Sequence, residues 1–140
     1  MTHPSYRWRL SVLLIMLSGA ICARADIVRI VIDGTINPVS AEYVDRGLAR
    51  AADQHAQAVL IEIRTPGGLV DSTRDIIAKM LASPVPVIVF VYPTGSRSAS
   101  AGFYILEAAD IAAMAPGTNT GAAHPVLMGK IGRASCRERV

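Results

Sequence analysis

Two short segments of the sequence combine the residue types that acyl transfer requires. Residues 65–68 (Thr-Pro-Gly-Gly) follow the apolar run 58–63, and residues 99–102 (Ala-Ser-Ala-Gly) follow the apolar run 87–92. A glycine pair after a strand can direct backbone N–H groups at an anion, and a serine in a turn of small residues can expose its hydroxyl. The two segments therefore predict a nucleophile, Ser100, beside oxyanion donors.

Each segment alone also fits a purely structural role. Pro-Gly-Gly is a common turn, because Pro sets the first dihedral angle and Gly accepts positive φ. Small residues at a helix start can simply permit close packing. The conjunction favours a site, since the N–H groups of Gly68 and Ala101 can converge on one oxyanion if both segments follow neighbouring parallel strands. Ser96 and Ser98 are expected to serve as a loop residue and a helix cap.

Alternating strands and helices must position these segments. Near-continuous apolar strands that alternate with helices are typical of a parallel sheet covered by helices. In such sheets, ligands bind beyond the carboxyl ends of the strands, so we expect an α/β fold with the candidate site at that edge. The predicted strands span 27–32, 58–63, 87–92 and 111–115; the predicted helices span 40–54 (capped by Ser40), 70–83 and 98–109; a loop is predicted over 117–125.

Both ends of the chain are expected to lie outside this domain. Residues 1–25 have a basic start, an apolar segment over 10–20 and an Ala-Arg-Ala cleavage site, which is typical of an export signal ending before Asp26. An uncleaved membrane anchor is the alternative. Residues 131–140 read as translated sequencing adapter and are interpreted as an artefact. This leaves 26–130 as the N-terminal part of one domain.

The net positive charge of the chain comes from residues near its two ends. The whole sequence has a net charge of +3, whereas residues 26–130 hold eight Lys or Arg against ten Asp or Glu. Nucleic acid is therefore not an expected partner. The two cysteines, Cys22 and Cys136, both lie in the ends, so no disulfide is expected in the domain. The sequence has neither metal-ligand spacing nor a phosphate-binding loop, and no metal or cofactor is predicted.

Taken together, the motifs resemble the NfeD-type membrane serine proteases of the Clp-protease class. The resemblance covers nearly all of 26–129 in the family's order. It implies a Clp/crotonase-like fold, here a partial domain, and a serine endopeptidase whose substrates are apolar segments of membrane proteins, stomatin-like proteins among them. The segments that carry it are 65–68, 86–92, 99–102, 114–119 (Met-Ala-Pro-Gly-Thr-Asn) and 121–125 (Gly-Ala-Ala-His-Pro).

By this resemblance Ser100 is the nucleophile, and the N–H groups of Gly68 and Ala101 form the oxyanion hole. The family's general base is a lysine on a helix well downstream of the Gly-Ala-Ala-His-Pro loop. Lys130 lies too close to that loop to take the role, so the fragment as printed is expected to be inactive. His124 is the alternative base, because its separation from Ser100 is close to the serine–histidine separation of the soluble Clp protease.

The resemblance also implies a location and partners. The export signal predicts the extracytoplasmic side of the membrane, and the resemblance implies that the full-length protein is bound to the membrane. The implied partners are a peptide or membrane-protein substrate, and a homo-oligomer is left open.

Two other classes of function compete with the peptidase. A non-catalytic scaffold would use the same fold to bind a membrane partner. A crotonase-like acyl-CoA enzyme would share the glycine oxyanion donors, but the export signal disfavours it because acyl-CoA is cytosolic. A lysine on an amphipathic helix roughly 35–45 residues after Ser100 would favour the peptidase over the scaffold.

Overall fold

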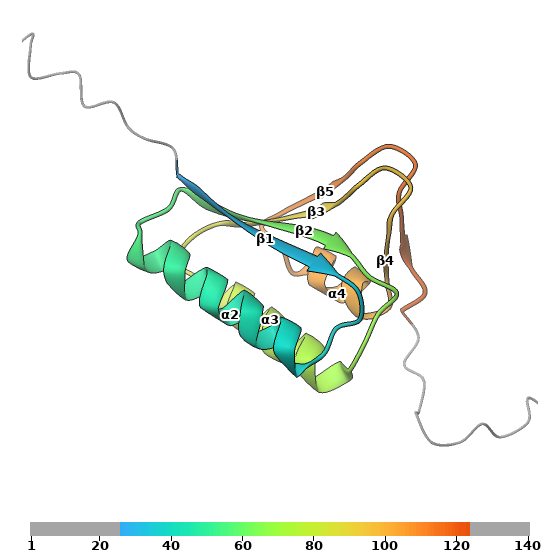
Figure 1. Cartoon of the computed structure of the whole chain (residues 1–140), viewed down its shortest axis with the longest axis horizontal. Coiled ribbons are helices and arrows are strands. Elements are labelled where there is room, and N and C mark those ends of the chain that lie inside the picture. The colour runs from blue at the N-terminus through green and yellow to red at the C-terminus, as the bar shows by residue number, and fades with distance from the viewer. Residues whose placement is uncertain (1–25, 124–140) are drawn as a thin grey trace, which may run out of the picture.

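A computed structural model describes residues 26–123; the predicted export signal, His124 and the predicted foreign tail lie outside these residues. Strands β1, β2, β3 and β5 form one parallel sheet in that order, and β4 pairs in parallel with β6 (Figure 1). The predicted α/β fold, with parallel strands alternating with helices, is confirmed. The elements are β1 (Ile27–Asp33), α2 (Pro38–Asp53), β2 (Ala58–Arg64), α3 (Val70–Leu81), β3 (Val87–Val91), β4 (Arg97–Ala99), α4 (Ala101–Glu107), β5 (Ile111–Met114) and β6 (Asn119–Gly121).

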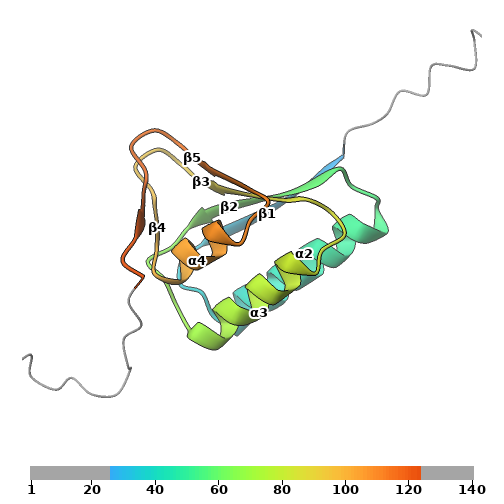
Figure 2. The same ribbon diagram turned by 180° about the vertical axis from the view of Figure 1, so that it is seen from behind.

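The helices α2, α3 and α4 all cover the same face of the four-stranded sheet (Figures 1 and 2). Alternate residues of β2 and β3 point into this layer and are buried, which makes the interface between sheet and helices the hydrophobic core. Within residues 26–123, no helix is both long enough and apolar enough to cross a membrane. The buried side chains of the two central strands are Val59, Ile61, Ile63, Val87, Val89 and Val91.

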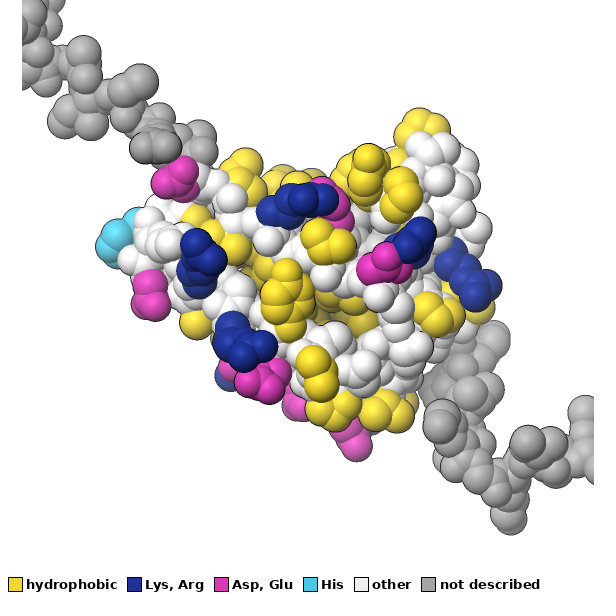
Figure 3. Space-filling view, viewed as in Figure 1, with side chains coloured by type: hydrophobic (Ala, Val, Ile, Leu, Met, Phe, Trp, Pro, Cys, Tyr) yellow, Lys and Arg dark blue, Asp and Glu magenta, His cyan; other side chains and the backbone are white. Residues whose placement is uncertain are grey.

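The surface around the β1 edge is partly apolar and carries paired charges. In Figure 3, cationic side chains lie beside anionic ones, with apolar side chains exposed near them. Two ion pairs join β1 to β2: Arg29 donates to both carboxylate oxygens of Glu62, and Arg64 donates to both oxygens of Asp33. The pairs reinforce the parallel register that matches Asp33 with Arg64.

The start of α2 differs from the prediction. Asn37, rather than Ser40, is the N-cap: the Ser40 N–H donates to Asn37 Oδ1 at 3.0 Å, and the Asn37 N–H donates to Ser40 Oγ at 2.9 Å. Pro38 occupies the first helical position, where its fixed φ suits the helix and its missing N–H costs no hydrogen bond. Ser40 therefore completes a reciprocal capping box from the third helical position.

The predicted helix over 98–109 is shorter than expected. It begins at Ala101, and the residues before it form strand β4, so the prediction that Ser98 caps the helix is wrong. The reason is tertiary. β4 pairs with β6, which lies within the predicted loop over 117–125, and Ser98 also bridges to Thr65. Strand pairing with two distant segments overrides the local helical preference of the small residues.

Candidate active site

Ser100 occupies the turn between β4 and α4. Its backbone angles, φ 52° and ψ −112°, lie in a region that non-glycine residues rarely adopt. The turn is held on both sides: the Ser100 N–H donates to the carbonyl oxygen of Gly121 at 2.7 Å, and the Phe103 N–H donates to the Ser100 carbonyl oxygen at 3.0 Å. A sharp strand-to-helix turn of this kind is a known way of presenting a nucleophilic serine hydroxyl.

Two glycines permit the close approach of backbone segments around Ser100. A Cβ on Gly67 would lie 2.8 Å from the Cβ of Ser100, and a Cβ on Gly102 would lie 2.4 Å from the Oγ of Ser98. A side chain at either position would push the turn away from its neighbours. The sequence motifs contain both glycines, but nothing in their spacing identifies these contacts.

The Thr-Pro-Gly-Gly segment is attached to β4 through Thr65, which is buried. The Thr65 N–H donates to the Arg97 carbonyl at 2.9 Å, and the Ala99 N–H donates to the Thr65 carbonyl at 3.0 Å. The Thr65 hydroxyl accepts the Gly67 N–H at 3.0 Å and donates to the Gly67 carbonyl at 3.1 Å. The structure thus brings the two predicted segments together through hydrogen bonds of Thr65, which the sequence motif contains but whose connecting role it does not reveal.

The two predicted oxyanion donors border the same pocket as Ser100. Ala101 is the first residue of α4, and N–H groups in the first helical turn have no partner inside the helix. Within residues 26–123, neither the Ala101 N–H nor the Gly68 N–H donates a hydrogen bond. The residues that carry the predicted nucleophile and the two predicted oxyanion donors therefore line one cavity.

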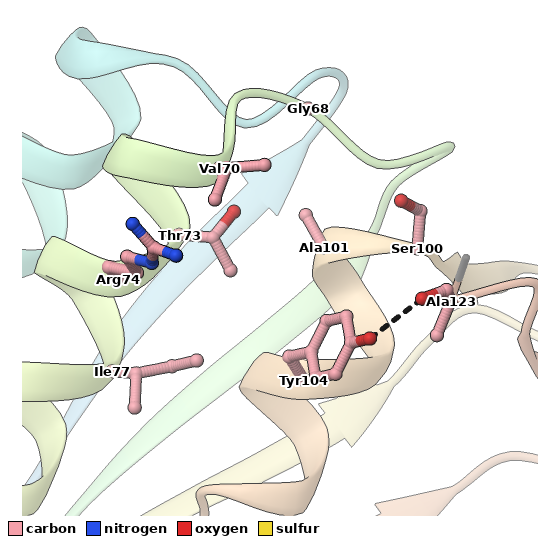
Figure 4. A pocket seen from close by; sticks show the side chains of 9 residues that line it. All are labelled: Gly68, Val70, Thr73, Arg74, Ile77, Ser100, Ala101, Tyr104 and Ala123. Carbon is pink, nitrogen blue, oxygen red and sulfur yellow. Dashed lines mark hydrogen bonds between the residues drawn. The ribbon is translucent and has the colours of Figure 1, made fainter. Parts of the chain in front are cut away.

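This pocket has a volume of about 290 Å³ and lies between α3 and α4 (Figure 4). Most of its walls are apolar. The hydroxyl of Thr73 donates to the Leu69 carbonyl at 2.7 Å and so does not serve as a free donor in the pocket. The pocket can accept an apolar side chain next to a carbonyl group held at Ser100. Its lining residues are Gly68, Val70, Thr73, Arg74, Ile77, Ser100, Ala101, Tyr104 and Ala123.

Tyr104 is one of the pocket residues that the sequence analysis did not predict. Its ring borders the cavity, and its hydroxyl donates to the Ala123 carbonyl oxygen at 2.6 Å (Figure 4). One signal was available: Tyr104 follows Ser100 by four residues, so the start of a helix places both on one face.

The described part of the chain places no lysine or histidine in this pocket. Lys79 forms an ion pair with Asp45 at 3.0 Å, and His55 follows the end of α2. His124, the predicted alternative base, is outside the described residues. Residues 26–123 also contain no group of three or more His, Cys, Asp or Glu that could hold a metal ion.

Comparison with known proteins identifies related sequences and structures. The family described as NfeD1b, N-terminal domain, matches residues 26–135. The membrane-bound protease PH1510 of Pyrococcus horikoshii is 39% identical over 116 residues, which are 83% of this chain and 26% of that protein. The chain thus spans about a quarter of the length of this relative.

Solved structures agree with this relationship. A lysine-to-alanine mutant of the 1510-N membrane-bound stomatin-specific protease, in complex with a substrate peptide, is similar with a TM-score of 0.73 and 39% identity, over 75% of this chain and 48% of that chain. A serine-to-alanine mutant of 1510-N matches with the same TM-score and 38% identity, over 75% of this chain and 51% of that chain. ClpP1 of Listeria monocytogenes has a TM-score of 0.58 and 26% identity, over 65% of this chain and 53% of that chain. The fold is therefore Clp-like.

Proposed function

Since the chain belongs to the NfeD1b N-terminal domain family, we propose that it is the N-terminal part of a serine endopeptidase that acts at a membrane. The observation that carries this proposal is the pocket lined by Ser100, Gly68 and Ala101, in which the Gly68 and Ala101 N–H groups donate no hydrogen bond within residues 26–123. The names of the relatives support it, since PH1510 is a membrane-bound protease and 1510-N is specific for stomatin. The proposal concerns the full-length protein.

The proposed chemistry is acyl transfer. The Oγ of Ser100 attacks the carbonyl carbon of the scissile peptide bond, and its proton passes to a general base. The negative charge that develops on the carbonyl oxygen is stabilised by the N–H groups of Gly68 and Ala101. The amine leaves with a proton from the conjugate acid of the base, and water then hydrolyses the ester on Ser100.

The general base is proposed to be a lysine that follows the described residues in the full-length protein. The solved 1510-N structures support this assignment, because the residues replaced by alanine in them are a lysine and a serine. His124 is the alternative base. The two differ in the pH dependence of kcat/KM, since an imidazole loses its proton near pH 6.5, whereas an ordinary lysine does so well above neutral pH unless its surroundings lower its pKa.

The proposed substrate is an apolar segment of a stomatin-like membrane protein. The apolar walls of the pocket support an apolar side chain beside the cleaved bond.

We further propose export to the extracytoplasmic side, with Asp26 as the mature N-terminus. This is supported by the family match, which begins at residue 26. Mass spectrometry of the exported protein should find Asp26 first; a membrane-retained species that keeps Arg7 would indicate an anchor.

Replacement of Ser100 in the full-length protein tests the proposed activity. Ser100→Ala should lower the hydrolysis of an apolar peptide by roughly 10³-fold or more, as in other serine enzymes that lose their nucleophile. Ser98→Ala is the matched control, since Ser98 is fully buried two residues earlier and does not line the pocket. A fluorophosphonate should label Ser100 in the wild type and in the control.

Two results would contradict the proposal. Full activity in Ser100→Ala, or a fluorophosphonate label on Ser98, would remove Ser100 as the nucleophile. Binding of a stomatin-like peptide without hydrolysis, equal in the wild type and Ser100→Ala, would support the non-catalytic scaffold instead.

A further inference from the structure

We propose that Tyr104 is a positioning and specificity-determining residue with two separable parts. Its ring forms a wall of the pocket beside Ser100, and its hydroxyl holds the segment 119–123 against the turn that carries Ser100. The inference rests on the proposed peptidase function and assigns a role to a residue outside the predicted nucleophile and oxyanion donors.

The ring belongs to the pocket by position. Tyr104 lies on α4 four residues after Ser100, and its side chain extends along the cavity in Figure 4. Ile77 of α3 also lines this cavity. Since α3 and α4 supply most of the apolar lining, removal of the ring would widen the pocket and change which side chains fill it.

Within residues 26–123, the Tyr104 hydroxyl holds the end of a segment whose other hydrogen bonds lie further upstream. β6 pairs with β4, and the Thr120 hydroxyl donates to the Ser98 carbonyl at 2.7 Å. Beyond β6 this pairing stops. Among residues 26–123, the bond from Tyr104 to the Ala123 carbonyl is the hydrogen bond that the structure provides for Ala122 and Ala123.

The backbone of this segment needs such a contact. Ala122 has φ 50°, a left-handed conformation that is unfavourable for a residue with a Cβ. It directly follows Gly121, whose φ is 121°. Of these two residues, Gly121 adopts positive φ freely because it has no Cβ, whereas the φ of Ala122 is maintained only when surrounding contacts determine it. The Tyr104 hydroxyl supplies this contact directly after the second of them.

The segment in turn contacts the nucleophile. The Gly121 carbonyl accepts the Ser100 N–H at 2.7 Å, so displacement of the segment would release the turn that gives Ser100 its unusual φ. The carbonyl that Tyr104 binds belongs to the peptide group joining Ala123 to His124. Tyr104 thereby links the pocket wall to the segment that binds the Ser100 turn.

Two substitutions in the full-length protein separate the parts. Tyr104→Phe keeps the ring and removes the hydroxyl. It should lower kcat by about two- to tenfold, the effect of one lost hydrogen bond, with KM and the preference among side chains beside the cleaved bond unchanged. Amide hydrogen exchange should become faster in peptides that cover 119–123 but not in those that cover 87–91.

Tyr104→Ala removes the ring as well. This variant should change the preference for the substrate side chain beside the cleaved bond. It should raise kcat/KM for substrates with a large apolar side chain there, relative to those with a small one, by severalfold. Tyr43→Phe is the matched control, because Tyr43 has nearly the same exposed fraction, 42% against 43% for Tyr104, and lies on α2 outside this pocket. Tyr43→Phe should change neither kcat nor the amide hydrogen exchange of residues 119–123.

The outcomes distinguish this inference from the proposed function. If Ser100→Ala is inactive while Tyr104→Phe matches the wild type in kcat and exchange, the role of Tyr104 is wrong and the peptidase stands. If Tyr104→Phe accelerates exchange across the whole domain, Tyr104 is only structural and the inference is overturned. If Ser100→Ala retains activity, the peptidase assignment fails, and the exchange in 119–123 still decides whether Tyr104 holds this segment. Should Tyr104→Ala not fold, Tyr104→Phe carries the test.

Discussion

Gly67 lies so close to Ser100 that a methyl group on its Cα would be 2.8 Å from the Cβ and 3.2 Å from the Oγ of the serine. The contact joins the segment after β2 to the turn after β4. Gly67 is therefore needed for two reasons: it turns the chain with φ 121°, and it leaves space for the Ser100 side chain.

Gly67→Ala should displace Ser100 and lower both peptide hydrolysis and the rate of fluorophosphonate labelling in the full-length protein. Gly34→Ala is the matched control, because Gly34 has a similar φ of 126° but nothing within 4 Å of an added Cβ. Both variants should lose about 1–3 kcal/mol of unfolding free energy from backbone strain. Only Gly67→Ala should lose activity, and equal activity in the two variants would show that the contact with Ser100 is unimportant.

The backbone donors can be tested only by a backbone change. A Cβ on Gly68 would lie 2.1 Å from the Ile36 carbonyl oxygen, so any side chain there would disrupt packing as well as the proposed oxyanion hole. An amide-to-ester replacement that deletes the N–H of Gly68 or Ala101 avoids this problem. Each ester should lower kcat by roughly 10²–10³-fold. The same replacement at Leu69, whose N–H donates to the Ile36 carbonyl at 2.9 Å, should affect stability more than kcat.

Deletion of the buried hydroxyls of Ser98 and Thr65 should have different effects on the free energy of unfolding. Ser98 Oγ is the buried side-chain polar atom without a hydrogen-bond partner among the described residues, whereas the Thr65 hydroxyl bonds both the N–H and the carbonyl of Gly67. Ser98→Ala should therefore leave the unfolding free energy unchanged or raise it by about 1 kcal/mol. Thr65→Val should lower it by about 1–3 kcal/mol, since it leaves buried groups unpaired. Chemical denaturation measures both, and a destabilising Ser98→Ala would contradict the first.

The ion pair between Arg29 and Glu62 should make stability depend on pH. Hydrogen bonds from Arg29, at 2.8 and 2.6 Å, lower the pKa of Glu62, whose side chain is only 14% exposed. A carboxyl group with a lower pKa in the folded state adds stability that is fully present above its unfolded pKa and is lost as the pH falls through its folded pKa. Unfolding free energy should therefore decrease on acidification, and Arg29→Gln should flatten this decrease.

An NMR titration of the Glu62 carboxyl group provides the direct measurement. Its midpoint should rise in Arg29→Gln, and an unchanged midpoint would show that the pair does not lower the pKa. Arg64→Gln is the matched control. The pKa of Asp33 is lowered by its hydrogen bonds with Arg64, but this pair is about half exposed on both sides, so solvent should weaken its contribution to stability.

The N-cap of α2 is Asn37 instead of the predicted Ser40, and the sequence contains the information needed to assign it correctly. Asn-Pro followed by serine at the third helical position is itself a pattern for a helix start, yet Ser40 was predicted as the cap. The N-cap, the proline and the capping partner are local features, so no distant contact was needed to assign them.

The alternation of strands and helices can be predicted from the sequence alone, because apolar periodicity and turn residues act over a few neighbouring positions. The sequence also predicts the residues of the candidate site, since Ser100 and Gly68 lie in motifs whose composition suits acyl transfer. Long-range packing, in contrast, sets the pairing of β4 with β6, the close approach of Gly67 to Ser100, and the hydrogen bond from Tyr104 to the Ala123 carbonyl. These contacts join segments far apart in the chain, and their geometry depends on how the sheet and helices pack rather than on local sequence.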